Sequence, residues 1–145
     1  MAKQYAPHIE RLLAVAASGK LLAAGGRRDA AGVDDSSVHL LQLPKLNLRF
    51  SAPLIAAASA LTFCGDDWLL AGTAKGDLAI WRTSGDGKMP AWQQAVHSGA
   101  VRALVASDSQ VLSVGDDGVL ALHAIEMDGD RPRLREQAKR RLSEQ

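Results

Sequence analysis

Two histidines and an aspartate near the end of the chain have the side-chain types that acid–base chemistry uses. His97 and His123 lie on either side of Asp117. A histidine beside a carboxylate can transfer protons, or it can hold neighbouring strands together through buried hydrogen bonds. Ser107 and Ser113 lack the strained glycine elbow of a hydrolase nucleophile. We therefore expect a structural network here and no catalytic residue.

Paired acidic residues raise the possibility of a metal site, but their surroundings favour turns. Asp66-Asp67, Asp116-Asp117 and Asp128-Gly129-Asp130 lack the later glycine and glutamate of a calcium-binding loop. The histidines form no short-spaced pair with one another or with Cys64. Cys64 adjoins an apolar run and is typical of a small buried residue. We expect no metal and no cofactor.

The last segment of the chain is strongly basic. Residues 131–141 contain six basic side chains and one acid, Glu136. Such a segment can attract an anionic partner or nucleic acid, although it has no aromatic side chain on which bases could stack. Leu134, Ala138 and Leu142 recur every four residues, which allows a short helix, and we expect a basic polar tail over 128–145. The basic residues are Arg131, Arg133, Arg135, Lys139, Arg140 and Arg141.

Composition indicates a small soluble protein without a strong overall field. Of the 145 residues 47% are hydrophobic but only 4% are aromatic, and the formal net charge is +1. This balance supplies an aliphatic core and no general attraction to nucleic acid or membranes. A single cysteine excludes an internal disulfide. There is no secretory signal, and the longest apolar stretch, 53–63, is too short to span a bilayer, so we expect a cytoplasmic protein.

Two stretches of the chain repeat each other at a spacing of 42 residues. Residues 60–81 and 102–123 each hold three short apolar runs separated by turn residues. The glycine before the last run accepts the positive φ of a tight hairpin turn. A period of about 40–45 residues with three or four strands is that of a β-propeller blade. The matched pairs are Leu70 with Leu112, Gly76 with Gly118 and Leu78 with Leu120.

A weaker first unit precedes these two. The segment 20–26 matches 68–72 in pattern, 48 residues earlier, and 27–33 is an expected exposed insertion. The Ala-rich stretch 53–59 has helical propensity, but its place in the repeat predicts a strand. The expected units span about 8–45, 48–84 and 92–127, together forming domain 1–127.

The third unit carries a set of residues found in one known repeat family. His97 is followed by Ser98-Gly99, Ser113 lies on the second strand, and Asp117-Gly118 forms the hairpin turn. In these residues the unit resembles the WD40 repeat. The resemblance implies a hydrogen-bonded network of His97, Ser113 and Asp117 inside a blade. It places His123 where the family has tryptophan.

The second unit shows the converse pattern. Trp81 occupies the family's tryptophan position, but Ala71, Lys75 and Ile55 replace the serine, aspartate and histidine. The resemblance covers residues 48–127 and extends only weakly to 8–45. It implies an all-β fold, a partial propeller of about three four-stranded blades.

This fold predicts a function in binding. At 42 residues per blade, 145 residues give about three and a half blades, whereas propellers use four to eight. Because a blade cannot bury its faces alone, we expect another copy, a partner or a longer parent to supply the rest, and an isolated chain that is poorly stable or oligomeric.

We expect a non-catalytic protein–protein interaction scaffold. Two alternatives stay open: a regulatory or sensor module of a larger enzyme or defence-type assembly, and a nucleic-acid accessory protein that uses the basic tail. The expected partner-binding residues are Arg27, Arg28, Trp68, Lys75 and Arg102.

Overall fold

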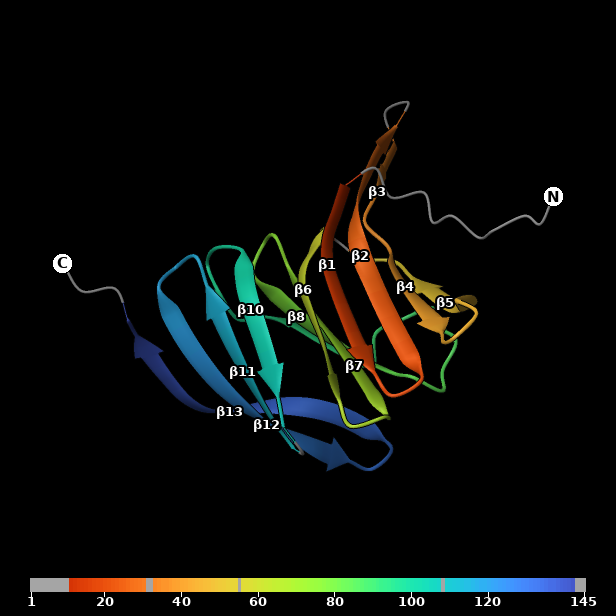
Figure 1. The fold of residues 1–145 in the computed structure, drawn as a ribbon. Coiled ribbons are helices and arrows are strands. Elements are labelled where there is room, and N and C mark those ends of the chain that lie inside the picture. Colours follow the sequence, from red (N-terminus) through yellow and green to blue (C-terminus); the bar gives the residue numbers. More distant parts are fainter. Residues whose placement is uncertain (1–10, 31–32, 55, 108, 143–145) are drawn as a thin grey trace.

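The computed structural model of the chain consists of strands joined by turns (Figure 1). It describes residues 11–30, 33–54, 56–107 and 109–142, without the side chains of 11–16, 18 and 26–35. The described residues form three antiparallel sheets that follow one another in chain order. The described residues form no helix, and therefore no helix that is long and apolar enough to cross a membrane. The expected all-β fold is confirmed.

The first sheet has the strand order β1-β2-β4-β5, with β3 paired to the far end of β2. β2 runs on to Ala30 and pairs with β3 through Arg28 and Asp35. The predicted insertion at 27–33 is therefore mostly a β-hairpin extension of the sheet, which Figure 1 shows projecting beyond it. The strands are β1 (Arg11–Ser18), β2 (Leu21–Ala30), β3 (Val33–Asp35), β4 (Val38–Gln42) and β5 (Asn47–Ala52).

The second and third sheets share one topology, in which each strand pairs with the next along the chain. Their second and third strands are joined by tight turns at Gly76 (φ 97°) and Gly118 (φ 76°), as the repeat predicts. A Cβ at Gly76 would also collide with the His97 carbonyl oxygen, so the position requires glycine. The strands are β6 (Ala58–Cys64), β7 (Trp68–Thr73), β8 (Asp77–Arg82) and β9 (Trp92–Ala95), then β10 (Val101–Ala106), β11 (Gln110–Gly115), β12 (Val119–Asp128) and β13 (Arg131–Arg141).

The sheets differ from the predicted units in their outer strands. β5 completes the first sheet and β9 completes the second, whereas the sequence division assigned both segments to the units that follow. The repeat period is the same whichever neighbour an outer strand joins. Only its hydrogen bonds to β4 or β8 decide the assignment.

The segment after Met127 is the fourth strand of the third sheet, so the prediction of a helical or free tail was wrong. β13 pairs with β12 along its whole length. Pro132 and Leu134 alternate inward with a period of two. A spacing of four residues fits this alternation as well as it fits a helix, so the stripe in the sequence could not distinguish the two.

The core of the described residues consists of two layers, one between the first and second sheets and one between the second and third. Leu40 and Phe50 of the first sheet pack with Leu69 and Trp81 of the second. Residues of β7 and β8 pack on the other side against the third sheet. Cys64 is buried at this second boundary, and its thiol donates a hydrogen bond to the Ser107 carbonyl oxygen at 2.9 Å. The predicted buried place of Cys64 is confirmed.

The first unit is offset by one residue from the predicted alignment. Gly25 and Gly72 both face the first strand of the next sheet, where an added Cβ would meet Ala58 and Val101 respectively. They are therefore equivalent at a spacing of 47 residues, not 48. A slip of one residue exchanges the two faces of a strand, so the corrected spacing decides which side chains reach the core.

The Ala-rich segment before β6 is a connection and not the predicted strand. β6 begins only at Ala58. Ala56 and Ala57 are buried without belonging to a strand, and Ile55 lies outside the described residues. Small side chains let this connection pass close to the core, a placement that the repeat pattern alone does not show.

Candidate interaction surfaces

His97, Ser113 and Asp117 form one hydrogen-bond network. His97 Nε2 lies 2.8 Å from Ser113 Oγ, and its Nδ1 lies 3.1 Å and 3.2 Å from the two Asp117 carboxylate oxygens. The same carboxylate accepts the backbone N–H groups of Ser98 at 3.0 Å and Val119 at 3.1 Å. The network joins the loop before β10 to β11 and to the β11–β12 turn. The structure thus brings together the three residues that the WD40 resemblance singles out.

This network has the atoms of a Ser-His-Asp triad but not its accessibility. Ser113 is completely buried and His97 is 5% exposed. A triad serine must reach a substrate carbonyl carbon, which Ser113 Oγ cannot do from this position. Burial alone would raise the pKa of Asp117, but hydrogen bonds from Ser98, Val119 and His97 outweigh it and lower the pKa. The geometry suits an ionised acceptor that holds three chain segments together.

His123 stands where the WD40 resemblance places a tryptophan, and it does not join the network of His97, Ser113 and Asp117. Its side chain is 4% exposed, and its Nδ1 has no hydrogen-bond partner among the described residues. Burial lowers its pKa, Glu136 opposes that shift, and Lys139 and His97 add to it. His123 is therefore held neutral under conditions where an exposed histidine would take up a proton.

We expect His123→Leu to remove an acid-dependent loss of stability. Below about pH 6.5 the unfolded chain protonates His123, whereas the folded protein resists protonation. The free energy of unfolding of the wild type should therefore decrease as the pH falls from about 6.5 through the lowered folded pKa. Thermal unfolding midpoints between about pH 8 and pH 5 measure this slope. An equal slope in the variant would contradict the assignment.

The second sheet has a different local network, which the sequence analysis missed. Thr73 is completely buried, and its Oγ1 accepts the backbone N–H groups of Lys75 at 3.2 Å and Asp77 at 3.1 Å. Ala71 stands where the third sheet has Ser113, and Trp81 Nε1 has no partner among the described residues. The available signal was a threonine four residues before an aspartate across a Lys-Gly turn.

Trp68 is less available to a partner than its place after a polar turn suggested. Its side chain is half-buried against the core layer between the second and third sheets. The Arg82 guanidinium lies over its ring, 4.7 Å from the centroid. Arg82 also donates from Nη2 to the Asp130 carbonyl oxygen at 2.8 Å, linking the second sheet to the β12–β13 turn.

Lys75 and Arg102 flank the loop that contains His97, at the opposite end of the second and third sheets from Trp68. Lys75 is exposed. Arg102 donates from Nη2 to Asp116 Oδ2 at 2.7 Å, and this hydrogen bond lowers the pKa of Asp116. Arg27 and Arg28 are in β2, but their side chains lie outside the described part of the chain. A role for these residues in partner binding stays a prediction.

The predicted basic residues line the exposed edge strand β13, and some are engaged within the sheet. Arg133 and Arg135 both pair with Glu126 across the β12–β13 hairpin, at 3.4 Å and 2.6 Å. Arg141 donates from Nη1 to the Asp117 carbonyl oxygen at 3.0 Å. These contacts reduce the charge presented to an anionic partner. Charged side chains on an edge strand also oppose pairing with other strands.

The third sheet carries an apolar face turned away from the second sheet. Val105, Leu112 and Leu122 lie side by side across three strands, and Val114 and Leu120 form the next row. Val105 is 61% exposed and the other four are partly exposed. None of these five residues, which we call the outer apolar face, belongs to either core layer of the described chain.

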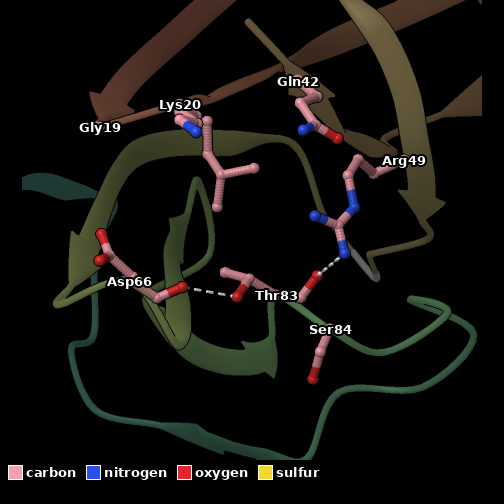
Figure 2. Close-up of a pocket in the computed structure, with 8 residues that line it drawn as sticks. Gly19, Lys20, Gln42, Arg49, Asp66, Thr83 and Ser84 are labelled. Atoms are coloured by element: carbon pink, nitrogen blue, oxygen red, sulfur yellow. Dashed lines mark hydrogen bonds between the residues drawn. The ribbon is translucent and has the colours of Figure 1, made fainter.

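A pocket of about 460 Å³ lies between the first and second sheets (Figure 2). Arg49 donates from Nη2 to the Thr83 carbonyl oxygen at 3.2 Å, and Thr83 Oγ1 donates to the Asp66 carbonyl oxygen at 2.6 Å. Sequence reasoning missed this pocket because its residues come from turns and strands that only the fold brings together. It is lined by Gly19, Lys20, Leu21, Gln42, Arg49, Asp66, Thr83 and Ser84.

The fold is shared with β-propeller proteins of known structure. The chain matches no protein-family model and no curated protein by sequence. Sqt1 of Chaetomium thermophilum, solved bound to the N-terminus of ribosomal protein L10, superposes with a TM-score of 0.77 at 15% identity over 94% of this chain. BamB of Moraxella catarrhalis gives 0.69 at 20% identity over 90%. The computationally designed Ika4 protein gives 0.68 at 19% identity over 89%.

These comparisons establish the class of fold: the three sheets are consecutive blades of a partial β-propeller. The chain spans 39% of the Sqt1 chain and 38% of the BamB chain, but 78% of the Ika4 chain. It also spans 33% of the designed Ika8 protein. The described blades therefore correspond to only part of the natural propellers.

Proposed function

We propose that the chain is a non-catalytic, protein-binding part of a propeller, whose outer apolar face packs against a further blade from outside these 145 residues. One observation carries this proposal. In the second sheet, Leu70, Leu78 and Ile80 are completely buried against the third sheet. The 42-residue repeat places three leucines of the outer apolar face at the same positions, namely Leu112, Leu120 and Leu122.

The outer apolar face also restricts which side chains an incoming blade can place against it. Gly72 leaves room for Val101, and Gly25 leaves room for Ala58, where neighbouring sheets meet. The third sheet has Val114 at the equivalent position. An incoming blade therefore needs a glycine or alanine opposite Val114, because two valines would overpack the boundary.

A second copy of this chain is the less suitable occupant. To continue the propeller head to tail, it would have to offer the face of its first sheet that points away from the second. Ala24, His39 and Leu41 lie on that face and are already buried. Sqt1 was solved with a peptide of another protein, which supports a binding role for a propeller of this kind.

The non-catalytic part of the proposal can be tested at Ser113. Because Ser113 is completely buried, it should resist a fluorophosphonate probe in the folded protein, and its labelling would contradict this part of the proposal.

We expect an appended blade to stabilise the chain. The test fuses a second copy of residues 96–142 after residue 145, with Val101→Gly in the appended copy. The thermal unfolding midpoint should rise by several degrees, since newly buried leucines contribute about 1.5–3 kcal/mol each. Leu112→Lys with Leu122→Lys in the parent sheet should abolish the gain while leaving the unfused chain folded.

The matched control replaces Leu70 and Ile80 by lysine at the equivalent covered positions, where folding should fail. Light scattering over a dilution series completes the test. No gain from the appended blade would contradict the proposal. A stoichiometric dimer abolished by Leu122→Lys would show instead that a second copy covers the face.

A further inference from the structure

We propose that the pocket between the first and second sheets binds a carboxylate side chain from an acidic segment of a protein partner. The pocket is separate from the outer apolar face, so this inference can hold or fail independently of blade docking. It depends on two basic side chains, Lys20 and Arg49, that the fold brings to one cavity.

Neither basic side chain is neutralised within the described part of the chain. Lys20 and Arg49 are exposed and form no ion pair there. The bond from Arg49 Nη2 to the Thr83 carbonyl oxygen fixes the guanidinium but leaves other N–H donors available. A guanidinium held in this way loses little freedom when it binds a carboxylate through two N–H groups.

The other lining residues set the orientation of the ligand. Figure 2 shows Asp66 across the pocket from Arg49. Its charge would repel a carboxylate on that side and so direct it toward Lys20 and Arg49. The Gln42 side chain adds a further amide to the lining, and buried Leu21 supplies apolar surface for the aliphatic part of an acidic side chain.

The pocket suits an acidic peptide better than nucleic acid. Its lining contains no aromatic side chain on which a base could stack. It also contains one acid beside its two bases, which weakens attraction to a polyphosphate backbone. A volume of about 460 Å³ accommodates one side chain and part of the adjoining backbone.

The test titrates the full chain with an acetylated, amidated tetraglutamate peptide, using the tetraglutamine peptide as the uncharged control. Backbone amide shifts of Gly19 and Ser84, at opposite walls of the pocket, report binding by NMR. We expect Lys20→Gln and Arg49→Gln each to weaken binding about tenfold or more. Lys88→Gln is the matched control, because Lys88 is exposed outside the pocket, and it should leave the affinity unchanged.

Lys20→Gln separates binding from folding, since Lys20 makes no side-chain hydrogen bond in the described structure whereas Arg49 also links two sheets. The proposal is supported if the amides of Gly19 and Ser84 shift with tetraglutamate but not with tetraglutamine, and if these shifts are lost in Lys20→Gln. Equal binding of tetraglutamine would overturn it. So would loss of binding in Lys88→Gln only, tighter binding of single-stranded RNA at the same amides, or no binding of tetraglutamate.

Discussion

Replacing Trp81 with alanine is expected to lower the free energy of unfolding by about 3–5 kcal/mol. Trp81 is 1% exposed and lies in the core layer between the first and second sheets. Its Nε1 has no hydrogen-bond partner among the described residues, so the loss should come from packing and the cavity left behind. Denaturant unfolding followed by circular dichroism measures the change.

The matched control is Trp92→Ala, because Trp92 is only partly buried at the edge of the other core layer. Trp92→Ala should lower the free energy of unfolding by clearly less than Trp81→Ala does. Trp81→Phe should recover most of the stability, since no hydrogen bond is lost. Equal losses for Trp81→Ala and Trp92→Ala would contradict the larger contribution expected of the buried Trp81.

The second large effect is expected from the network of the third sheet. His97→Ala should destabilise the protein by about 3 kcal/mol, because it removes a partner of the Ser113 hydroxyl and of the Asp117 carboxylate in a buried place. Ser98→Ala is the control: its backbone N–H still donates to Asp117, so stability should stay within about 0.5 kcal/mol of the wild type.

The pH dependence provides an independent check of the network. Because the folded pKa of Asp117 is lowered, its ionised form stabilises the protein above the unfolded pKa of about 3.9. This contribution is lost as the pH falls through the folded pKa. His97→Ala should therefore flatten the acid limb of the stability curve. An unchanged limb would indicate that His97 does not hold the carboxylate.

Much of the fold could be predicted from local patterns. The turns at Gly76 and Gly118 were expected, because a hairpin turn needs a residue that accepts positive φ. The network of His97, Ser113 and Asp117 was expected from the resemblance of this unit to the WD40 repeat. Both kinds of signal lie within one unit of about 40 residues, where the chain can reach only a few partners.

The errors arose where a local pattern fits two structures. The stripe from Leu134 to Leu142 fits a helix and a strand, and pairing with β12 decided for the strand. The segments that became β5 and β9 fit either adjacent unit, and their hydrogen bonds to β4 and β8 decided the sheet. The alignment of the first unit was wrong by one residue because Gly25 and Gly26 match the motif equally well.

The sequence by itself therefore determined the 42-residue repeat and the hairpin turns at Gly76 and Gly118, because neighbours along the chain specify both, and its resemblance to the WD40 repeat pointed to the residues of the His97 network. The tertiary structure decided the two features on which the proposed binding depends. Among the described residues it left the outer apolar face of the third sheet without a covering sheet, and it brought Lys20 and Arg49 into one pocket. Both depend on how one sheet packs against the next, and such contacts between distant segments are not encoded in the period of any single strand.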